Sequence, residues 1–138
     1  MRSGEVRCVH RGAWTQVFHE DGTPVAGIRG RPGATGDTAA GQPFGADAIE
    51  MQPGSAFPLH VHVGDHLLYV IRGRGSVEIG GRARPVRTGD TIYIPADVPH
   101  AVTAAEGSTA LFFLAVGLPH RDLSSPDRMQ LVDPVHGA

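Results

Sequence analysis

The sequence contains no lysine and no asparagine, and all 12 of its basic residues are arginines. Without lysine, the chain has no residue for a Schiff base, for a lysine-linked cofactor or for the lysine position of a P-loop. A single cysteine, Cys8, has no partner for an internal disulfide. These absences exclude every lysine-dependent mechanism and any internal disulfide.

Long hydrophobic runs are also missing. The longest strongly apolar stretch covers residues 110–116, far short of the roughly 20 residues that cross a bilayer. A formal net charge of -2 without any basic run gives no support for nucleic-acid binding. The first seven residues include polar and charged ones where a signal peptide would place an apolar region. We therefore expect one cytoplasmic domain over residues 1–138 that binds neither nucleic acid nor membrane.

The 19 glycines and 11 prolines punctuate a series of short strand-like runs. Val77 and Ile79 alternate with polar residues, as do Ile92 and Ile94, which indicates strands with one buried face. The spacing is typical of an antiparallel sandwich or barrel, with its core in residues 46–116. The runs cover residues 46–51, 57–63, 66–72, 76–79, 83–86, 91–94, 100–104 and 109–116.

The two ends of the chain are less regular. Residues 1–45 predict one or two peripheral strands followed, over 27–45, by a glycine-rich loop that is either a functional cover or disordered. The tail, residues 117–138, is polar. Within it Ser125 and the proline after it predict a short helix that runs to Val132.

Four of the eight histidines form a spaced constellation. On an extended strand His60 and His62 share one face, which gives two imidazoles side by side. The three residues after His62 allow a tight reversal that would aim His66 at the same point, and His100 opens another strand behind a proline. This pattern predicts one divalent transition metal, and four neutral imidazoles suit Fe, Mn, Zn, Ni or Cu alike.

The residues around these histidines carry a family resemblance. The first segment reads Gly54, five residues, His60-Val61-His62, three residues, His66, six residues and Gly73; the second reads Gly89, five residues, Pro95, one residue, Asp97, two residues and His100. These segments resemble the two signature motifs of the cupin superfamily. The resemblance implies a double-stranded β-helix, or jelly roll, with a metal site of His60, His62, His66 and His100 inside its wider mouth.

The sequence departs from the usual cupin pattern at three positions. His66 stands where a glutamate ligand is usual, Asp97 replaces a glycine of the second motif, and Ala104 replaces a later asparagine. A four-histidine variant known in the superfamily looks like this one. Because four histidines add no negative charge, the ion would keep a net charge of +2 and be more Lewis acidic than one with a carboxylate ligand.

The resemblance implies three kinds of function. We expect a metal-dependent enzyme that acts on a small organic substrate, with a dioxygenase-type oxidoreductase favoured, like the cupin dioxygenases of quercetin or diketones. The first alternative is a non-redox zinc cyclase or isomerase, as in four-histidine cupins that act as polyketide cyclases. The second is a metal-containing binding protein without turnover. The sequence does not identify a catalytic residue.

A mainly apolar pocket should surround the metal. The predicted lining residues are Phe57, Leu59, Leu68, Val70, Phe112 and Leu114; the candidates for a general base, each more typical of a surface residue, are Glu20, His19, Glu50, Asp47 and His120. An apolar outer face, the segment around Trp14 and a small core also predict a homodimer.

Overall fold

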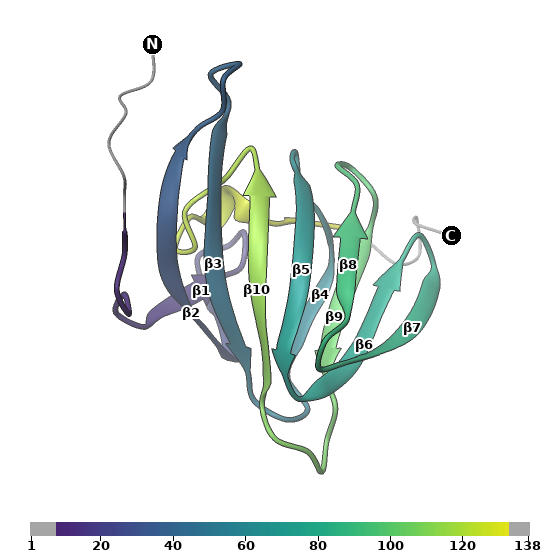
Figure 1. Cartoon of the computed structure of the whole chain (residues 1–138). Helices are drawn as coiled ribbons and strands as arrows, with labels where there is room; N and C mark the ends of the chain where they lie inside the picture. Colours follow the sequence, from purple (N-terminus) through teal and green to yellow (C-terminus); the bar gives the residue numbers. More distant parts are fainter. Residues whose placement is uncertain (1–7, 133–138) are drawn as a thin grey trace.

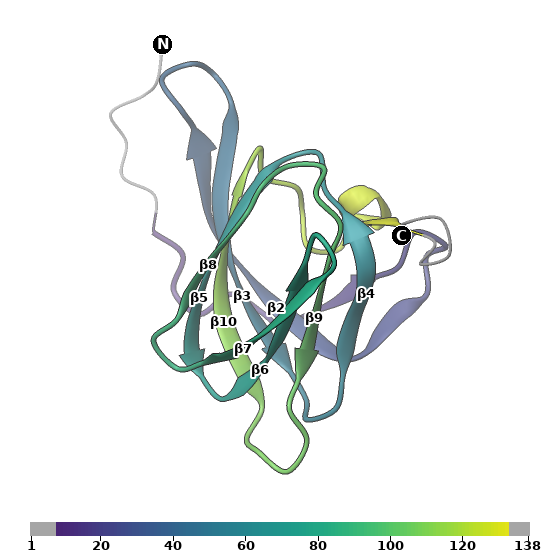
Figure 2. The ribbon, with the colours of Figure 1, turned by 90° about the vertical axis from the view of Figure 1, so that its right-hand side faces the viewer.

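The computed structural model describes residues 8–132, and β-strands dominate that part of the chain. One antiparallel sheet has the order β1 (Thr15–Phe18), β2 (Pro24–Asp37), β3 (Pro43–Met51), β10 (Leu111–Leu118), β5 (Asp65–Arg72) and β8 (Thr91–Ile94). The other has the order β11 (Gln130–Leu131), β4 (Ala56–Val61), β9 (His100–Ala104), β6 (Arg74–Ile79) and β7 (Arg82–Arg87). The sheets face each other in Figures 1 and 2, which confirms the all-β jelly roll. No helix in residues 8–132 is long and apolar enough to cross a membrane.

The alternating apolar residues of the predicted strands form the core between the two sheets. Val77 of β6 and Ile94 of β8 are each 2% exposed, and Ile79 and Ile92 pack against the same cluster. Gly80 and Gly81 have φ angles of 57° and 83° and join β6 to β7 in a tight hairpin. The eight strands expected between residues 46 and 116 are therefore confirmed.

The glycine-rich loop expected over residues 27–45 is wrong, because β2 and β3 fill most of that segment. They pair antiparallel and rise as a long hairpin beyond the other strands in Figure 1. The glycines serve close packing: a Cβ at Gly33 would lie 2.2 Å from the Ala46 carbonyl oxygen, and one at Gly30 would lie 2.6 Å from Leu123 Cδ1. Glycine within a strand often marks such close approach, and the same composition is also typical of a loop.

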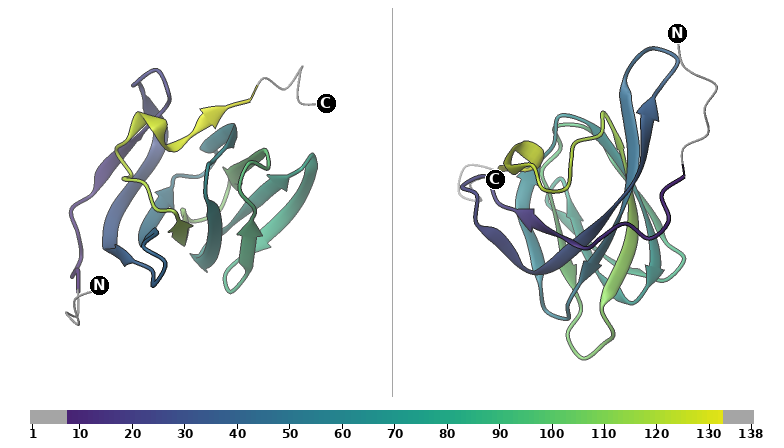
Figure 3. Two further views of the ribbon diagram at one scale, coloured as in Figure 1. Left: turned by 90° about the horizontal axis from the view of Figure 1, so that it is seen from above. Right: turned by 90° about the vertical axis from the view of Figure 1, so that its left-hand side faces the viewer.

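The C-terminal tail crosses one end of the barrel, between β10 and β11 (Figure 3). Its helix is shorter than predicted: Ser125 caps a single 3-10 turn, Pro126–Arg128, and the chain then becomes extended at Met129. Leu123 and Met129 are 2% and 1% exposed, so burial of these two side chains holds the tail on the barrel. The predicted continuation to Val132 is wrong because β11 pairs with β4 instead.

Large hydrophobic side chains are exposed on the outer face of β5 and on β8. They are Leu67, Tyr69, Ile71 and Tyr93, with exposed fractions of 42–58%. The homodimer stays a prediction, and this face is where the second copy would fit.

We expect Gly33→Ala to lower the free energy of unfolding by about 1–3 kcal/mol, because its Cβ would collide with the backbone of β3. Gly36→Ala is the matched control on the same strand, since no atom lies within 4 Å of the Cβ it would gain. That variant should be neutral or slightly more stable. Urea denaturation of both variants measures the difference, and equal stabilities would contradict the close-packing role of Gly33.

Candidate metal centre

Three histidines converge at the end of the barrel that the C-terminal tail crosses. His60 lies on β4, His62 follows its last residue, and His100 opens β9 directly opposite His60. Their ring centroids lie 4.2–4.8 Å apart, and one potential ligand atom from each falls within 4.8 Å of the others. The predicted meeting of these three side chains is therefore confirmed.

The second motif is tied to the first by a backbone hydrogen bond. The N–H of Asp97 donates to the carbonyl of His62 over 2.9 Å. Asp97 has a φ of 62°, the left-handed conformation for which the usual cupin pattern supplies glycine and which aspartate tolerates better than most residues. The turn that leads to His100 is thus preserved despite the substitution.

Hydrogen bonds to backbone carbonyls set the tautomer of each clustered histidine. His60 Nδ1 contacts the carbonyl of Pro58, His62 Nδ1 that of Arg128, and His100 Nδ1 that of Val98. A carbonyl only accepts, so each Nδ1 must carry the proton and donate it, which leaves each Nε2 with its lone pair.

These lone pairs form a donor set that suits a cation. The Nε2 atoms of His60 and His62 lie 3.0 Å apart, and neither has a proton to give the other. Two acceptors at that distance repel, whereas a metal ion between them would bind both. Imidazole ligands whose other nitrogen donates to an outer partner are the usual arrangement at protein metal sites, so the donor set fits a divalent transition metal.

Burial keeps the histidines neutral. It lowers the pKa of His60 and of His62 to about 2, with the neighbouring imidazoles adding to the effect. Burial likewise lowers the pKa of His66 to about 3, and it lowers the pKa of His100. Neutral imidazole is the form that ligates metal, so the site is ready to bind an ion at neutral pH.

His66 does not belong to this cluster, so the prediction of four converging histidines is corrected to three. Its ring centroid lies 4.1 Å from that of His62, but none of its nitrogens groups with the other ligand atoms. Its Nδ1 is buried and has no hydrogen-bond partner among the described residues. The turn after His62 therefore brings His66 beside the cluster and leaves it turned aside.

An apolar cavity adjoins the cluster, and two of the six predicted lining residues, Phe57 and Leu68, lie on its wall. Leu59 faces elsewhere because β4 has a register irregularity between Phe57 and His60, which places both of those on the inner face. Val70 is buried in the core away from the cavity.

On β10 the structure settles the face that alternation left ambiguous. Phe113 and Ala115 are each 4% exposed and line the cavity, whereas Phe112 and Leu114 do not. The guanidinium carbon of Arg72 lies over the ring of Phe112, 5.5 Å from the ring centroid. Both faces of this strand are apolar, so sequence parity could not choose between them. Ile49, Ile94, Val102 and Met129 complete the apolar wall without having been predicted.

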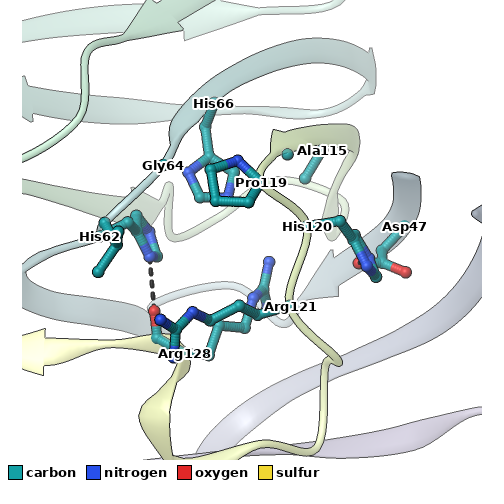
Figure 4. Close-up of a pocket in the computed structure, with 11 residues that line it drawn as sticks. Asp47, His62, Gly64, His66, Ala115, Pro119, His120, Arg121 and Arg128 are labelled. Carbon is teal, nitrogen blue, oxygen red and sulfur yellow. Dashed lines mark hydrogen bonds and ion pairs between the residues drawn. The ribbon is translucent and has the colours of Figure 1, made fainter. Parts of the chain in front are cut away.

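A second, polar pocket is also lined by His62 and His66 (Figure 4). It is also lined by Arg121 and Arg128 and by a buried pair in which His120 Nε2 lies 2.8 Å from Asp47 Oδ2. The remaining base candidates lie elsewhere: Glu50 pairs with Arg29 on the sheet surface, Glu20 accepts from the Leu131 N–H, and His19 lies in the β1–β2 turn.

Asp47 and His120 are base candidates for which the sequence predicts surface positions, and no sequence pattern singles out Arg128. Residues 47 and 120 are 73 positions apart, so no local pattern joins them. A glycine at position 45 is required for this contact, because a Cβ there would lie 2.8 Å from His120 Cγ. The pair depends on how the tail packs on β3.

We expect His60→Ala and His100→Ala each to weaken Zn²⁺ binding by more than about 100-fold, beyond the 10–100-fold typical of losing an outer-sphere partner. His10→Ala, on the exposed N-terminal segment, is the control and should bind as the wild type does. Competition with a chromophoric chelator measures the affinities, and circular dichroism shows whether the barrel is intact. Unchanged affinity in a folded His100→Ala protein would remove this residue from the ligand set.

The metal-free protein should lose stability as the pH falls from 6.5 toward 3. Unfolded histidines take up protons near pH 6.5, whereas the buried ones resist protonation down to about 2 or 3, so the unfolded state binds more protons across this window. Each buried histidine contributes up to about 1.4 kcal/mol per pH unit below 6.5. Urea denaturation at pH 7.0 and 5.5 should show a smaller decline for His60→Gln than for the wild type; equal declines would contradict the cause.

Residues 48–117 match the family model described as the cupin domain. An uncharacterized protein of Methanocaldococcus jannaschii is 38% identical over 58 residues, which are 41% of this chain and 46% of that protein, so the match spans less than half of the relative. Among solved structures, the polyketide cyclase RemF from Streptomyces resistomycificus has a TM-score of 0.66 at 22% identity, covering 94% of this chain and 89% of its own.

The salicylate 1,2-dioxygenase from Pseudaminobacter salicylatoxidans has a TM-score of 0.50 at 20% identity, covering 54% of this chain and 20% of its own. At these identities both structures show a shared fold and nothing finer. The matched span contains all four of the histidines predicted as ligands, His60, His62, His66 and His100. The chain belongs to the cupin domain family.

Proposed function

We propose that this cupin is a metal-dependent enzyme that catalyses a non-redox proton-transfer reaction, such as an isomerisation or cyclisation, on a small organic substrate with an enolisable carbonyl. The observation that carries the proposal is the placement of the His120–Asp47 pair on the same pocket as His62, a member of the metal-binding cluster. A divalent ion held there would supply a Lewis acid that polarises the carbonyl oxygen.

His60, His62 and His100 would hold this ion, and His66 lines the pocket beside them. The ring of His66 adjoins that of His62, and its buried Nδ1 lacks a partner among residues 8–132. A buried imidazole nitrogen without a partner is costly, and a polar group of a bound substrate would relieve that cost. In the chelator competition described above, His66→Ala should therefore keep most of the Zn²⁺ affinity that His60→Ala and His100→Ala lose.

The His120–Asp47 pair would move the proton. The 2.8 Å contact requires Nε2 of His120 to donate to the carboxylate, so Nδ1 keeps the lone pair that can accept a proton from substrate. Asp47 is 3% exposed and also accepts the Gly33 N–H over 3.3 Å, which fixes the carboxylate and, through it, the imidazole. Asp47 is thus a positioning residue and His120 the group that would act on substrate.

The second candidate is the dioxygenase favoured on sequence alone. The apolar wall beside the cluster, which includes Phe57, Leu68 and Phe113, supports it because apolar and aromatic groups bind best against such side chains. The fold likeness to the salicylate dioxygenase covers only about half of this chain, whereas the likeness to the polyketide cyclase covers nearly all of it. A dioxygenase also has no evident need for the His120–Asp47 pair, so we place this candidate second.

Metal analysis combined with two assays tests the proposal. Elemental analysis of the protein purified without added metal identifies the ion. Proton NMR in D₂O without oxygen then measures α-proton exchange in a panel of enolisable ketones, relative to the spontaneous rate. We expect exchange that falls about 100- to 10,000-fold in His120→Gln with the metal content unchanged.

Gln16→Ala, on the exposed outer strand β1, is the control and should exchange at the wild-type rate. Substrate consumption that requires oxygen, together with a redox metal, would establish the dioxygenase instead. Metal binding with neither activity across the panel would favour a binding protein without turnover. The homodimer and the cytoplasmic location stay predictions beside this proposal.

A further inference from the structure

One buried cation in the polar pocket has no counter-charge among residues 8–132. Arg128 is 9% exposed and lines both the polar pocket and the apolar cavity. Among residues 8–132, its guanidinium forms neither an ion pair nor a hydrogen bond with a side chain. Buried arginines are normally paired, because an unpaired charge out of water is costly. An anion bound beside this guanidinium would offset that cost.

Asp47 does not supply that anion. It is the carboxylate nearest to the site, and it already accepts from His120 and from the Gly33 N–H. It influences Arg128 only through space, where it partly offsets the burial that lowers the arginine's pKa. The metal ligands add no negative charge either, since all are neutral histidines. A bound divalent ion would therefore increase the excess of positive charge.

The side chain is also placed to act together with the metal site. In Figure 4 the side chain of Arg128 lies on the same pocket as His62 and His66, with Arg121 and the His120–Asp47 pair beside it. The backbone carbonyl of Arg128 accepts from His62 Nδ1, so one residue both orients a metal ligand and presents a cation next to it. Substrate bound to the guanidinium would lie against the metal-binding histidines.

We propose that Arg128 binds a carboxylate of the substrate, so that the enzyme acts on a small oxo acid. The planar guanidinium matches a carboxylate through two parallel hydrogen bonds, which a neutral ester or amide lacks the charge to replace. This inference rests on the proposed function for the reacting carbonyl and adds the anionic group beside it. Exposed Arg121 lies at the same pocket and would attract the anion without enclosing it.

Binding of pyruvate and of its neutral amide, pyruvamide, tests the assignment. Calorimetry on Zn²⁺-loaded wild-type protein should give at least about 10-fold tighter binding of pyruvate than of pyruvamide. Arg128→Gln should weaken pyruvate binding by about 10- to 100-fold and leave pyruvamide nearly unchanged. Arg82→Gln, on the β6–β7 hairpin, is the control and should bind pyruvate as the wild type does.

A second measurement does not depend on a variant that may disturb the buried segment. The side-chain Nε–H signal of Arg128 in ¹⁵N-labelled wild-type protein should shift with pyruvate and saturate with the calorimetric affinity; Arg128→Lys serves only to assign the signal. Equal binding of pyruvate and pyruvamide, or pyruvate binding that leaves this signal in place, overturns the carboxylate site. Zinc content measured in the same samples distinguishes the two proposals. If the protein binds pyruvate but no zinc, the metal-dependent function is rejected and the carboxylate site at Arg128 stands.

Discussion

The repulsion between imidazole lone pairs organises the open end of this barrel. His60 and His62 direct two Nε2 acceptors at each other over 3.0 Å, and burial prevents a proton from relieving the contact. The fold accepts this cost because backbone carbonyls of three separate segments hold the Nδ1 atoms in place. Cation binding reverses the sign of the interaction, so the arrangement is unfavourable alone and favourable around an ion.

The C-terminal tail converts this cluster into a divided site. After β10 the tail packs His120 against Gly45 and places its Nε2 beside the carboxylate of Asp47. Further along, the carbonyl of Arg128 accepts a hydrogen bond from His62. The tail is held by the burial of Leu123 and Met129 rather than by a long helix or a wide sheet contact. Residues with polar functions thus lie on the least regular part of the fold, where segments carry fewer backbone constraints.

Local periodicity explains why the core strands and three ligands were predictable. Alternation along β6 and β8 and the His60-Val61-His62 spacing are properties of a single strand. The predictions are wrong where contact with a second segment determines the local structure. The glycines of β2 predict a loop because their packing partners, Ala46 and Leu123, are distant in sequence. The irregularity in β4 reversed the face of Leu59, the two apolar faces of β10 hid the orientation of Phe113, and nothing local pairs His120 with Asp47.

The two pockets on either side of the histidines differ in the way that a substrate with two unlike ends requires. One side is walled by Phe57, Leu68 and Phe113, and the other contains Arg128, Arg121 and the His120–Asp47 pair. Burial against the first wall would favour binding of an apolar group, and neutralisation of Arg128 would favour binding of an anionic group at the second. A substrate that satisfies both must place its middle against the histidines. The separation of apolar and charged walls would therefore select the reacting carbonyl by its position between the two ends of the substrate. The metal-binding histidines would then need no specific contact with either end.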